Sequence, residues 1–563
     1  MRLDKLTIGS PKESLSHQFK NLKDVTIDFD QDHWVTVVIG WNGTGKSNVL
    51  EALAIIFREL ISPKKSPKID FAFNLSYRMG AAEAERFIDI DHDPDRSGEK
   101  YIIKVTAKSA LDDSMIHMDV NTVSNVKLKA FLDESRNLPK YVFSYYSGES
   151  SRMHDIFAPY LQWYDEKLRR GEDPGIKRLF YALPVHSQFV LLAFLIGENN
   201  DVLDFLKNNL GLDPDSGLES VLFVLRKPPW KEQPDGDPRF WGAKGIVSEF
   251  LSRLYEIALA PVETERRVPV SLWNKETLQF KYLYVKDIQS LRKLVAQQAP
   301  AEFFRDLEST YVSQLIEEVR IKVKLRKTDE TVTFRELSEG EQQLLTVLGL
   351  IKFTAEEESL FLLDEPDTHL NPRWSVDYLS YLRNVVASSS GGNATSHILL
   401  TTHNPLAVAE LVREQVQILQ LRDEGTSRRV VAFYPEVDPR GMGYAAIVAS
   451  DMFGIASTMD QPTQLLLEKQ RILGSKKLLS AEEQQELELL NEKLNKLGFR
   501  FFHPDDEYSR YLRLRNEILS ARFKTEETAI LAEHVVALER NEREKLSQEL
   551  LGVLLSENGN DKS

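Results

Sequence analysis

The stretch Gly40-Trp41-Asn42-Gly43-Thr44-Gly45-Lys46-Ser47 decides the fold of this chain. An apolar, β-branched run, Trp34 to Ile39, precedes it, and an amphipathic run, Ser47 to Leu60, follows it. That order predicts a buried strand, a glycine-rich turn and a helix. Glycines at such a turn let the main chain wrap around phosphate oxygens at the helix N-terminus, where unpaired N–H groups and the helix dipole attract anions. The sequence therefore predicts a phosphate-binding loop.

The side chains of this loop suit a nucleoside triphosphate with Mg²⁺. Lys46 is expected to reach the β- and γ-phosphates of ATP, and Ser47 is expected to hold Mg²⁺ through its hydroxyl. Asn42, Gly43 and Gly45 complete the expected nucleotide contacts. Taken alone, the motif could be an ordinary strand-to-helix turn, so its meaning depends on the motifs that follow.

A second motif places two acids at the end of an apolar strand. Leu360 to Leu363 predicts a core strand, which delivers Asp364 and Glu365 at its carboxyl end, where open α/β sheets bind ligands. Asp364 is the expected metal-side carboxylate, and Glu365 is the expected base that orients the attacking water. The alternative is a solvated strand end, which the four apolar residues directly before the acids disfavour.

A histidine follows the next apolar strand, Ile398 to Leu400. His403 stands 39 residues after Asp364 (403 − 364), where it could hydrogen-bond the γ-phosphate or the attacking water. A lone histidine is more often structural, but this position favours a catalytic role.

The stretch Leu337-Ser338-Glu339-Gly340-Glu341-Gln342-Gln343 carries its serine 26 residues before Asp364 (364 − 338). By itself it predicts a helix N-cap with an acidic first turn. Beside the other motifs it resembles the signature of ABC-type ATPases, which caps a helix that faces the nucleotide of the opposite subunit. The resemblance implies that Ser338, Gly340 and Glu341 bind ATP in trans. ATP would then join two heads as a homodimer or larger homo-oligomer, and hydrolysis would release them.

The composition excludes several classes of protein. The chain has 563 residues and a mass of 64.5 kDa, a length that suggests about three or four domains. It has no cysteine, which excludes disulfides, thiolate catalysis and Cys-ligated zinc. The longest strongly apolar run, Phe189 to Ile196, has eight residues, whereas a membrane helix needs about 20, and no signal-peptide pattern is present. We therefore expect a cytoplasmic protein without membrane spans.

The net charge of −15 leaves no overall basic surface for nucleic acid. A local candidate is the run Ile321 to Lys327, where Lys322, Lys324 and Arg326 share one strand face. A hairpin strand with one solvated face is the favoured interpretation, with a returning strand at Thr331 to Phe334.

An insertion must separate the two lobes of the ATPase head, because Lys46 and Ser338 are 292 residues apart (338 − 46). Its sequence lacks sustained heptads, which excludes long coiled coils. A β-rich stretch from Ile69 to Val105 and a strand at Tyr141 to Tyr145 flank mostly helical material from about Ile156 to Leu315.

The predicted fold class is therefore α/β. We expect an ABC-type P-loop ATPase head, with a mixed sheet and flanking helices, a largely helical insertion between the lobes and a helical C-terminal tail. The predicted domains are an N-lobe with the P-loop at 1–70, a lid or helical insertion at 71–318, a C-lobe with signature, acids and histidine at 319–435, and a helical partner-binding or dimerisation region at 436–563.

The region after His403 predicts a β-hairpin, Val416 to Leu421 and Arg429 to Tyr434, and then two helices. The first helix runs from about Gln461 to Leu473, and the second begins at a capping box formed by Ser480 and Glu483. Three short motifs stand before them, Gly441-Met442-Gly443-Tyr444, Asp451-Met452-Phe453-Gly454 and Ser457-Thr458-Met459-Asp460. The expected helical hairpin suits partner binding or a packed dimerisation or core element equally well.

Two motifs resemble the soluble RecF, SMC and OLD-like ATPases more than transporters, namely Asn42 to Asn48 and Asp364 to Pro372. The Toprim hallmark of OLD nucleases is missing after His403. The tail motifs and the leucine-bearing hairpin instead resemble the PtuA-type ATPases of Septu antiphage defence systems, including those that occur beside retrons. That resemblance implies ATP and Mg²⁺ as cofactors, and a separate HNH nuclease subunit, PtuB, as partner. A retron reverse transcriptase with its DNA or RNA product is a further partner that it allows.

Two other functions stay open, an autonomous RecF-like DNA repair clamp and a scaffold that nucleotide stabilises. We expect no nuclease centre in this chain, because its histidines form no HNH-like cluster. A polar loop at Tyr145 to Gly148, with Arg152, could approach the nucleotide or a partner. The glutamine that usually lies between the lobes of such ATPases cannot be placed from the sequence.

Overall fold

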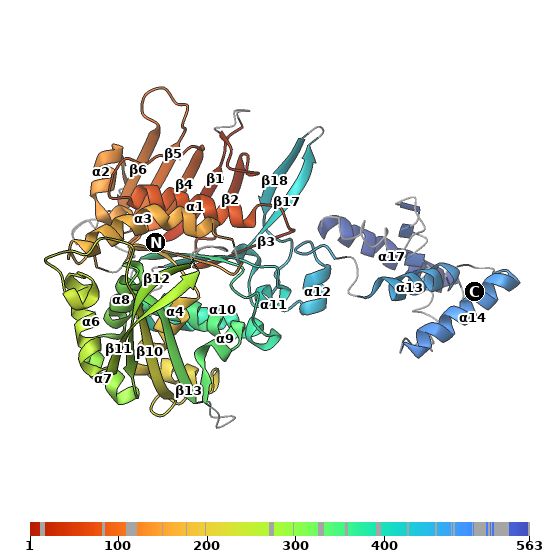
Figure 1. The fold of residues 1–563 in the computed structure, drawn as a ribbon. Coiled ribbons are helices and arrows are strands. Elements are labelled where there is room, and N and C mark those ends of the chain that lie inside the picture. Colours follow the sequence, from red (N-terminus) through yellow and green to blue (C-terminus); the bar gives the residue numbers. More distant parts are fainter. Residues whose placement is uncertain are drawn as a thin grey trace, which may run out of the picture. The chain divides into compact units, whose positions relative to one another are not determined.

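The structure is a computed structural model that describes residues 1–11, 17–80, 85–108, 121–148, 150–175, 177–197, 199–269, 275–296, 298–324, 331–354, 358–389, 396–424, 427–455, 459–474, 476, 479–497, 499, 514–515, 518–519, 521–522 and 540–560 (Figure 1). Two compact units are present. The first is Met1–Ala407 with Leu419–Phe433, and the second is Val408–Ile418 with Tyr434–Ser563.

A seven-stranded sheet carries the predicted ATPase motifs in the first unit. Its order is β18 (Ser427–Phe433), β17 (Val416–Glu424), β3 (Val35–Gly40), β16 (His397–Thr401), β15 (Ser359–Asp364), β8 (Tyr141–Tyr146) and β9 (Leu179–Tyr181). The strands from β3 to β9 run parallel. Parallel strands are covered on both faces, which explains why the middle strands read as continuous apolar runs. The strands predicted before the P-loop and before the two acids are thus confirmed.

A second sheet of six antiparallel strands lies across the helix α1 (Lys46–Ile61) (Figure 1). Its order is β2 (Val25–Asp28), β1 (Arg2–Ile8), β4 (Phe73–Met79), β5 (Arg86–His92), β6 (Tyr101–Lys108) and β7 (Asn121–Asn125). One apolar core joins residues of both sheets with those of α1, so the P-loop helix is buried on nearly every side. The predicted β-rich stretch from Ile69 to Val105 is confirmed by β4, β5 and β6.

The insertion between the lobes contains helices and a third sheet. Its helices include α2 (Leu128–Asp133), α3 (Arg152–Arg169), α4 (Val185–Ile196), α5 (Asn200–Asn208), α6 (Gly245–Ile257), α7 (Ile288–Val295) and α8 (Pro300–Val312). The sheet has the order β11 (Leu259–Pro269), β12 (Lys275–Val285), β10 (Leu218–Arg226), β13 (Ile316–Lys324) and β14 (Thr331–Thr333). The expectation of mostly helical material did not include β10, β11 and β12. β10 is buried almost without a break, which resembles a buried helix segment, whereas β11 and the outer half of β12 bury few side chains and lack a clear alternation.

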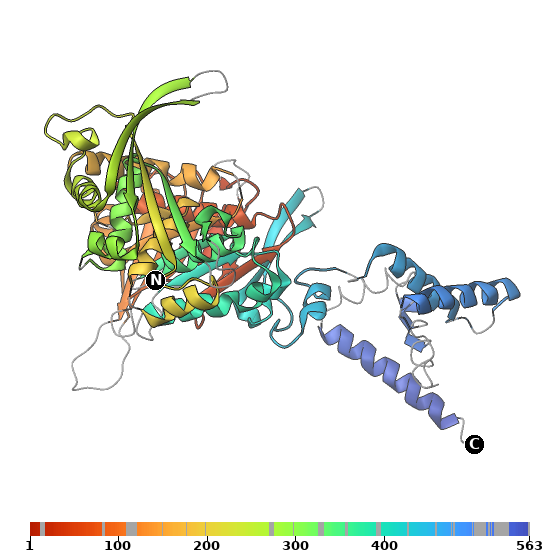
Figure 2. The ribbon, with the colours of Figure 1, turned by 60° about the horizontal axis from the view of Figure 1, so that its bottom comes forward.

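The long hairpin of β11 and β12 projects from this unit (Figure 2). On β13, Arg320, Lys322 and Lys324 face solvent while the residues between them are buried. This pattern is that of a strand with one solvated face, as predicted; Arg326 and the turn after it lie outside the described residues.

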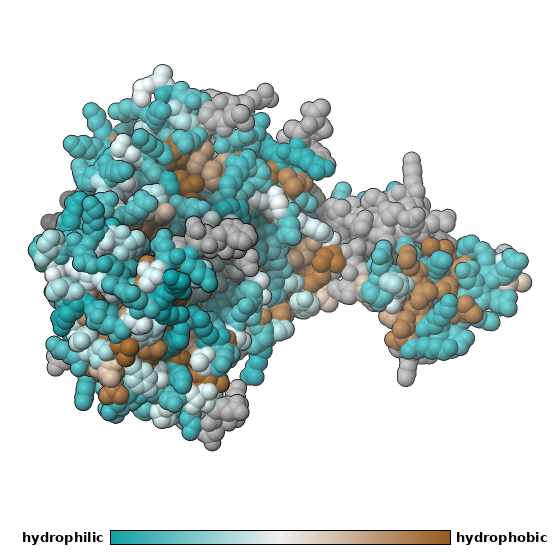
Figure 3. Space-filling model, in the orientation of Figure 1, coloured by the Kyte–Doolittle hydropathy of each residue, from teal (hydrophilic) through white to brown (hydrophobic). Residues whose placement is uncertain are grey.

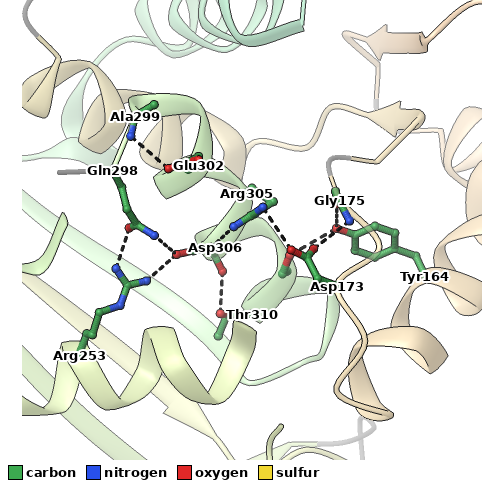
Figure 4. A network of polar contacts seen from close by, with 11 residues as sticks. Tyr164, Asp173, Gly175, Arg253, Gln298, Ala299, Glu302, Arg305, Asp306 and Thr310 are labelled. Carbon is green, nitrogen blue, oxygen red and sulfur yellow. Dashed lines mark hydrogen bonds and ion pairs between the residues drawn. The ribbon is translucent and has the colours of Figure 1, made fainter. Parts of the chain in front are cut away.

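A network of charges around the buried Asp306 joins helices of the insertion (Figure 4). Arg253 on α6 pairs with the buried carboxylate of Asp306 on α8 at 2.7 Å, and Gln298 contacts both residues. Arg305, the neighbour of Asp306, reaches Asp173 at 3.4 Å. These contacts hold α6 and α8 in a fixed relation.

A second buried cluster centres on Glu308 of α8, which binds Lys177 and His186. The Nδ1 atom of His186 accepts the Leu183 N–H at 2.7 Å, so its Nε2 carries the proton that it donates to Glu308 at 2.6 Å. Burial alone would raise the pKa of Glu308, but His186 and Lys177 lower it to about 2. The cluster lines a cavity of about 440 Å³.

The C-lobe of the head brings in α9 (Glu339–Thr354) and α10 (Pro372–Ser389), and the short helix α11 (Pro405–Val408) follows β16. α9 packs against α4 and α10. A Cβ atom on Gly349 of α9 would lie 2.0 Å from Val190 Cγ1 of α4, so the close crossing of these two helices requires glycine.

The second unit contains α12 (Tyr444–Ala449), α13 (Gln461–Gly474), α14 (Ala481–Lys496) and α17 (Arg540–Asn560). The predicted helical hairpin is confirmed, with α13 packed on α14 and a capping box at Ser480 and Glu483. Ser457 and Thr458 of the third tail motif lie outside the described residues. Apolar side chains gather on the surface of α13 and α14 (Figure 3), including the exposed Leu465 and Leu489. Within the described part of the chain, no helix is long and apolar enough to cross a membrane.

Candidate active site

The P-loop connects β3 to α1 through glycines at positive φ, 151° at Gly40, 84° at Gly43 and 96° at Gly45. A side chain is excluded at two of them by close neighbours as well. A Cβ atom on Gly40 would lie 2.4 Å from the Leu419 carbonyl oxygen, and one on Gly45 would lie 2.8 Å from Asn21 Oδ1. The helix begins directly at Lys46, so its first N–H groups point into the loop.

Lys46 lies over this loop. Its ammonium donates to the carbonyl oxygens of Gly40 at 2.9 Å and Trp41 at 3.3 Å. Burial lowers the pKa of Lys46, while Glu365 and Asp364 oppose that shift. Two carboxylates therefore stand close to the cation, and Asn42 and Gly43 at the tip of the loop are exposed. A phosphate group placed over the loop would find the cation and the main-chain N–H groups together.

Asn21 braces the loop from outside. It lies in a tight turn between Phe19 and Leu22, whose main chains bond each other at 3.0 Å and 2.9 Å. Its side chain donates to the Gly43 carbonyl at 2.9 Å and accepts from Asn48 at 2.6 Å. This contact cannot be predicted from the sequence, because nothing local in the Phe19 to Leu22 segment indicates which loop it meets.

Asp364 ends β15 and is 2% exposed. Burial raises its pKa, and hydrogen bonds from Thr401 and Ser47 oppose that shift. The Ser47 hydroxyl and the Asp364 carboxylate are thus adjacent. Among the described residues, no group of three His, Cys, Asp or Glu side chains could hold a metal by itself. The pair fits Mg²⁺, which keeps waters and takes phosphate oxygens as its other ligands.

Glu365, the next residue, has φ at +51°, a strained value for a residue with a side chain. Its N–H donates to the Thr401 carbonyl at 3.1 Å. His403 Nε2 lies 3.1 Å from Glu365 Oε1. The hydrogen bond from His403 is the main cause that lowers the pKa of Glu365. An ionised, oriented carboxylate results, which is the state that a general base needs.

Asp367 stabilises the segment that carries Glu365 through contacts with Thr402. It is buried and accepts the Thr402 hydroxyl at 2.8 Å and 3.0 Å. Burial raises the pKa of Asp367 to about 6. Thr402 in turn accepts the Asn404 N–H at 2.9 Å, so the loop that carries His403 is tied to the loop that carries Glu365.

The signature stretch forms the N-terminus of α9. The Ser338 N–H and hydroxyl both donate to Glu341 Oε2 at 2.9 Å, and the Glu341 N–H donates to the Ser338 hydroxyl at 3.3 Å. This is the N-cap arrangement that the stretch predicts by itself. A Cβ atom on Gly340 would lie 2.4 Å from the His369 carbonyl oxygen, so that position also requires glycine.

Gln343 links α9 to the acids within one chain. It accepts the His369 N–H at 3.2 Å, and its amide lies 3.5 Å from the Glu365 carbonyl oxygen. The Tyr145 hydroxyl at the end of β8 also bonds Gln343. A movement of the signature helix would therefore reach both Glu365 and β8.

The polar loop after β8 lies beside the acids. The Ser147 N–H donates to the Asp364 carbonyl at 3.3 Å, and its hydroxyl lies 3.3 Å from that of Thr368. Arg152 binds Glu51 of α1 at 3.2 Å and lies 6.0 Å from the Tyr146 ring. The segment from Tyr145 to Arg152, which begins at the end of β8 beside β15, contains no glutamine. Its polar side chains are those of tyrosine, serine, glutamate and arginine.

Two family models match parts of the chain. A model described as an AAA ATPase domain matches residues 17–161. A second one, described as an AAA domain and linked by its description to the AbiEii toxin of a Type IV TA system, matches residues 223–409. The two matched segments contain the P-loop on one side and the signature, the acids and His403 on the other.

The chain is also similar to two curated proteins. It is 26% identical over 168 residues to the Septu protein PtuA of Bacillus mycoides (strain KBAB4), a match that covers 29% of this chain and 22% of that protein. It is 21% identical over 454 residues to the Retron Vc95 probable ATPase of Vibrio cholerae serotype O1 biovar El Tor, covering 76% of this chain and 75% of that protein.

Among solved structures, the SMC head domain from Thermotoga maritima matches at 12% identity with a TM-score of 0.27, covering 78% of this chain and all of that one. The fold is defined by the strand order of the seven-stranded sheet, with the P-loop and the acids at its carboxyl edge. Together with the P-loop and the acids, the two ATPase-domain matches indicate a P-loop ATPase that is similar to the Septu protein PtuA and to the retron ATPase.

Proposed function

We propose that this protein is the ATP-hydrolysing regulatory subunit of an antiphage defence complex, and that ATP-dependent pairing of its heads controls a separate HNH nuclease. The observation that carries the ATPase part is the Glu365–His403 contact at 3.1 Å, beside Lys46 and at the carboxyl end of β15. The similarity to the Septu protein PtuA and to a retron ATPase supports the defence part.

The residues have distinct roles in the proposed site. Lys46 and the main chain of Asn42, Gly43 and Gly45 bind the phosphates of ATP, while Ser47 and Asp364 hold Mg²⁺, which neutralises charge on the phosphates. Glu365 accepts a proton from water as the water oxygen attacks the γ-phosphorus, and the bond to the bridging oxygen breaks to release ADP. His403 keeps the Glu365 carboxylate ionised and in place.

The other half of the site comes from a second copy in this proposal. Ser338 is exposed at the N-terminus of α9 and Glu341 is half-buried beside it, so both can be reached by a nucleotide held by another chain. Gln343 then relays the closure of the two heads to Glu365. The apolar surface of α13 and α14 is the proposed docking region for the nuclease subunit, which supplies the nuclease chemistry.

The first test is co-purification. A tagged Glu365→Gln chain, which should bind ATP without turnover, is expressed with its native gene neighbours and purified with MgATP. An HNH protein at fixed stoichiometry is the expected result, and Lys46→Ala should abolish the nucleotide dependence. Recovery of the chain alone, or with DNA in a strongly salt-dependent complex, would contradict the proposal in favour of a repair-type clamp.

A second test addresses the shared site. Ser338→Arg should keep ATP binding and abolish hydrolysis, because the arginine blocks the nucleotide of the opposite copy. The matched control is Ser290→Arg. That residue lies in the first turn of a helix, α7, in the insertion. Normal turnover in Ser338→Arg would exclude a site shared between two copies.

A further inference from the structure

Glu51 is a buried acid on the P-loop helix, with a side chain that is 6% exposed. It binds two cations, Lys20 from the turn that also holds Asn21, and Arg152 from the start of α3, at 3.2 Å for the latter. Three segments that are distant in the sequence therefore meet at one carboxylate beside the P-loop.

Glu51 holds these two cations near Ser47 and Asp364, the residues of the proposed Mg²⁺ site. Glu51 follows Ser47 by four residues on α1, so the two side chains lie on the same face of the helix. The same face meets Asp364, whose carboxylate bonds Ser47. The loop that delivers Arg152 is held there by the bond from Ser147 to the Asp364 carbonyl.

Arg152 interacts electrostatically with both Glu51 and Asp364. A hydrogen bond with Tyr146 raises the pKa of Arg152, and the charges of Glu51 and Asp364 add to that shift. The Arg152 side chain is 50% exposed, in contrast to the buried carboxylate that it contacts. A guanidinium that is anchored on one side and open on the other can bind a second oxyanion with its remaining N–H groups.

The charges around the site favour such a cation. Three carboxylates, Glu51, Asp364 and Glu365, stand against three cations, Lys20, Lys46 and Arg152. A triphosphate with Mg²⁺ adds about two negative charges, so every cation that Glu51 holds is one that the phosphates can compete for. Arginine is suited to that exchange because it binds carboxylate and phosphate with the same planar geometry.

We propose that Arg152 is a phosphate ligand of the bound nucleotide and that Glu51 competes with the triphosphate for it. This inference rests on the proposed ATP site. It adds a cation from the insertion to that site, so ATP binding would pull the start of α3 and the end of β8 toward the P-loop.

A purely structural ion pair between α1 and α3 is the alternative, and a pair of substitutions separates the two. If the pair is only structural, Arg152→Gln and Glu51→Gln break the same contact and change ATP affinity in the same direction. If Arg152 binds phosphate, Arg152→Gln weakens ATP binding by about 10-fold or more, since it removes a charge-assisted hydrogen bond. Glu51→Gln then tightens binding by several-fold.

The experiment is calorimetric titration of the full chain with ATP and ADP in the presence of Mg²⁺. Arg152→Lys, which keeps the charge, should lose less affinity than Arg152→Gln. Because Glu51→Gln also frees Lys20, the double variant Glu51→Gln/Arg152→Gln is needed, and it should lose the gain. Thermal unfolding without nucleotide verifies that each variant is folded.

The possible results are distinguishable. Weaker ATP binding in both single variants, or unchanged binding in Arg152→Gln, would overturn the role of Arg152 while leaving the ATP site intact. A wild-type chain that binds no MgATP, or one in which Lys46→Ala changes nothing, would instead refute the proposed function, and this inference with it.

Discussion

The side chain of Asn21 donates a hydrogen bond of 2.9 Å to the main-chain carbonyl of Gly43. A residue of the turn before β2 thus fixes the tip of the P-loop, whose glycines would otherwise be free to adopt many conformations. The shape of the nucleotide site therefore depends on the six-stranded sheet as well as on the sheet that carries the motifs.

Asn21→Ala should weaken ATP binding by about fivefold, because one hydrogen bond to a flexible loop contributes roughly 1 kcal/mol. Thermal stability should change little, since Asn21 is a loop residue on the surface. Titration with a fluorescent ATP analogue measures the effect, and Asn125→Ala, an exposed asparagine at the end of β7, is the matched control. Equal affinities in the two variants would show that the brace has no role in binding.

His403→Ala should shift the acidic limb of the ATPase pH profile to higher pH. The hydrogen bond from His403 lowers the pKa of Glu365, so its removal lets that pKa rise. A protonated Glu365 cannot accept the proton of water, and activity should then fall at a pH where the wild type is still active. The measurement is the rate of phosphate release by the residual activity from pH 4 to 9, and an unmoved acidic limb would contradict the prediction.

Glu308→Ala should destabilise the first unit by about 3–5 kcal/mol, because it leaves the buried Lys177 without a counter-charge. The double variant Lys177→Met/Glu308→Leu should recover much of that loss, since it removes both charges. Thermal unfolding followed by circular dichroism compares the two. A double variant as unstable as the single one would show that the loss of stability comes from altered packing and not from an unpaired charge.

The same pair makes the stability depend on pH. Since the pKa of Glu308 is lowered from 4.5 to about 2, the ionised form stabilises the folded state above pH 4.5. This contribution should disappear as the pH falls from about 4.5 toward 2. The melting temperature of Glu308→Gln should accordingly vary less with pH in that range than that of the wild type.

Gly349→Ala should destabilise the protein by about 1–3 kcal/mol, because the new methyl group meets Val190 at the α4–α9 crossing. Val190→Ala in the same chain should relieve the clash. Gly552→Ala is the matched control. Gly552 lies in α17 with open space around its Cα, and an alanine there should stabilise the helix by up to about 1 kcal/mol. A loss of stability in Val190→Ala/Gly349→Ala as large as in Gly349→Ala would contradict this account.

The sequence predicts those parts of the fold that depend on neighbours along the chain. The strand before Gly40, the helix after it, and the capping box at Ser480 follow from apolar runs and from short-range hydrogen bonding. The acids at the end of β15 and the hairpin of β17 and β18 follow for the same reason.

The contacts that shape the site are of another kind. Asn21 with Gly43, and Arg152 with Glu51, join segments whose approach depends on how whole sheets pack. The sequence around a lysine, an arginine or an asparagine in a polar stretch does not indicate which distant residue its side chain contacts. No local pattern therefore predicts these pairs. The strands β11 and β12 were not predicted because their exposed side chains do not alternate.

The strand before the P-loop, β3, has β17 and β16 as its two neighbours in the sheet. Gly40, the last residue of β3, and His397, the first of β16, are 357 positions apart in the sequence (397 − 40). During synthesis, β3 can pair with β16 and β17 only after both of these later strands have been made. Contacts between residues so far apart in the sequence form slowly. The nucleotide site can therefore assist folding only late in synthesis, because Asp364 and Glu365, which complete it beside the loop, emerge after most of the chain.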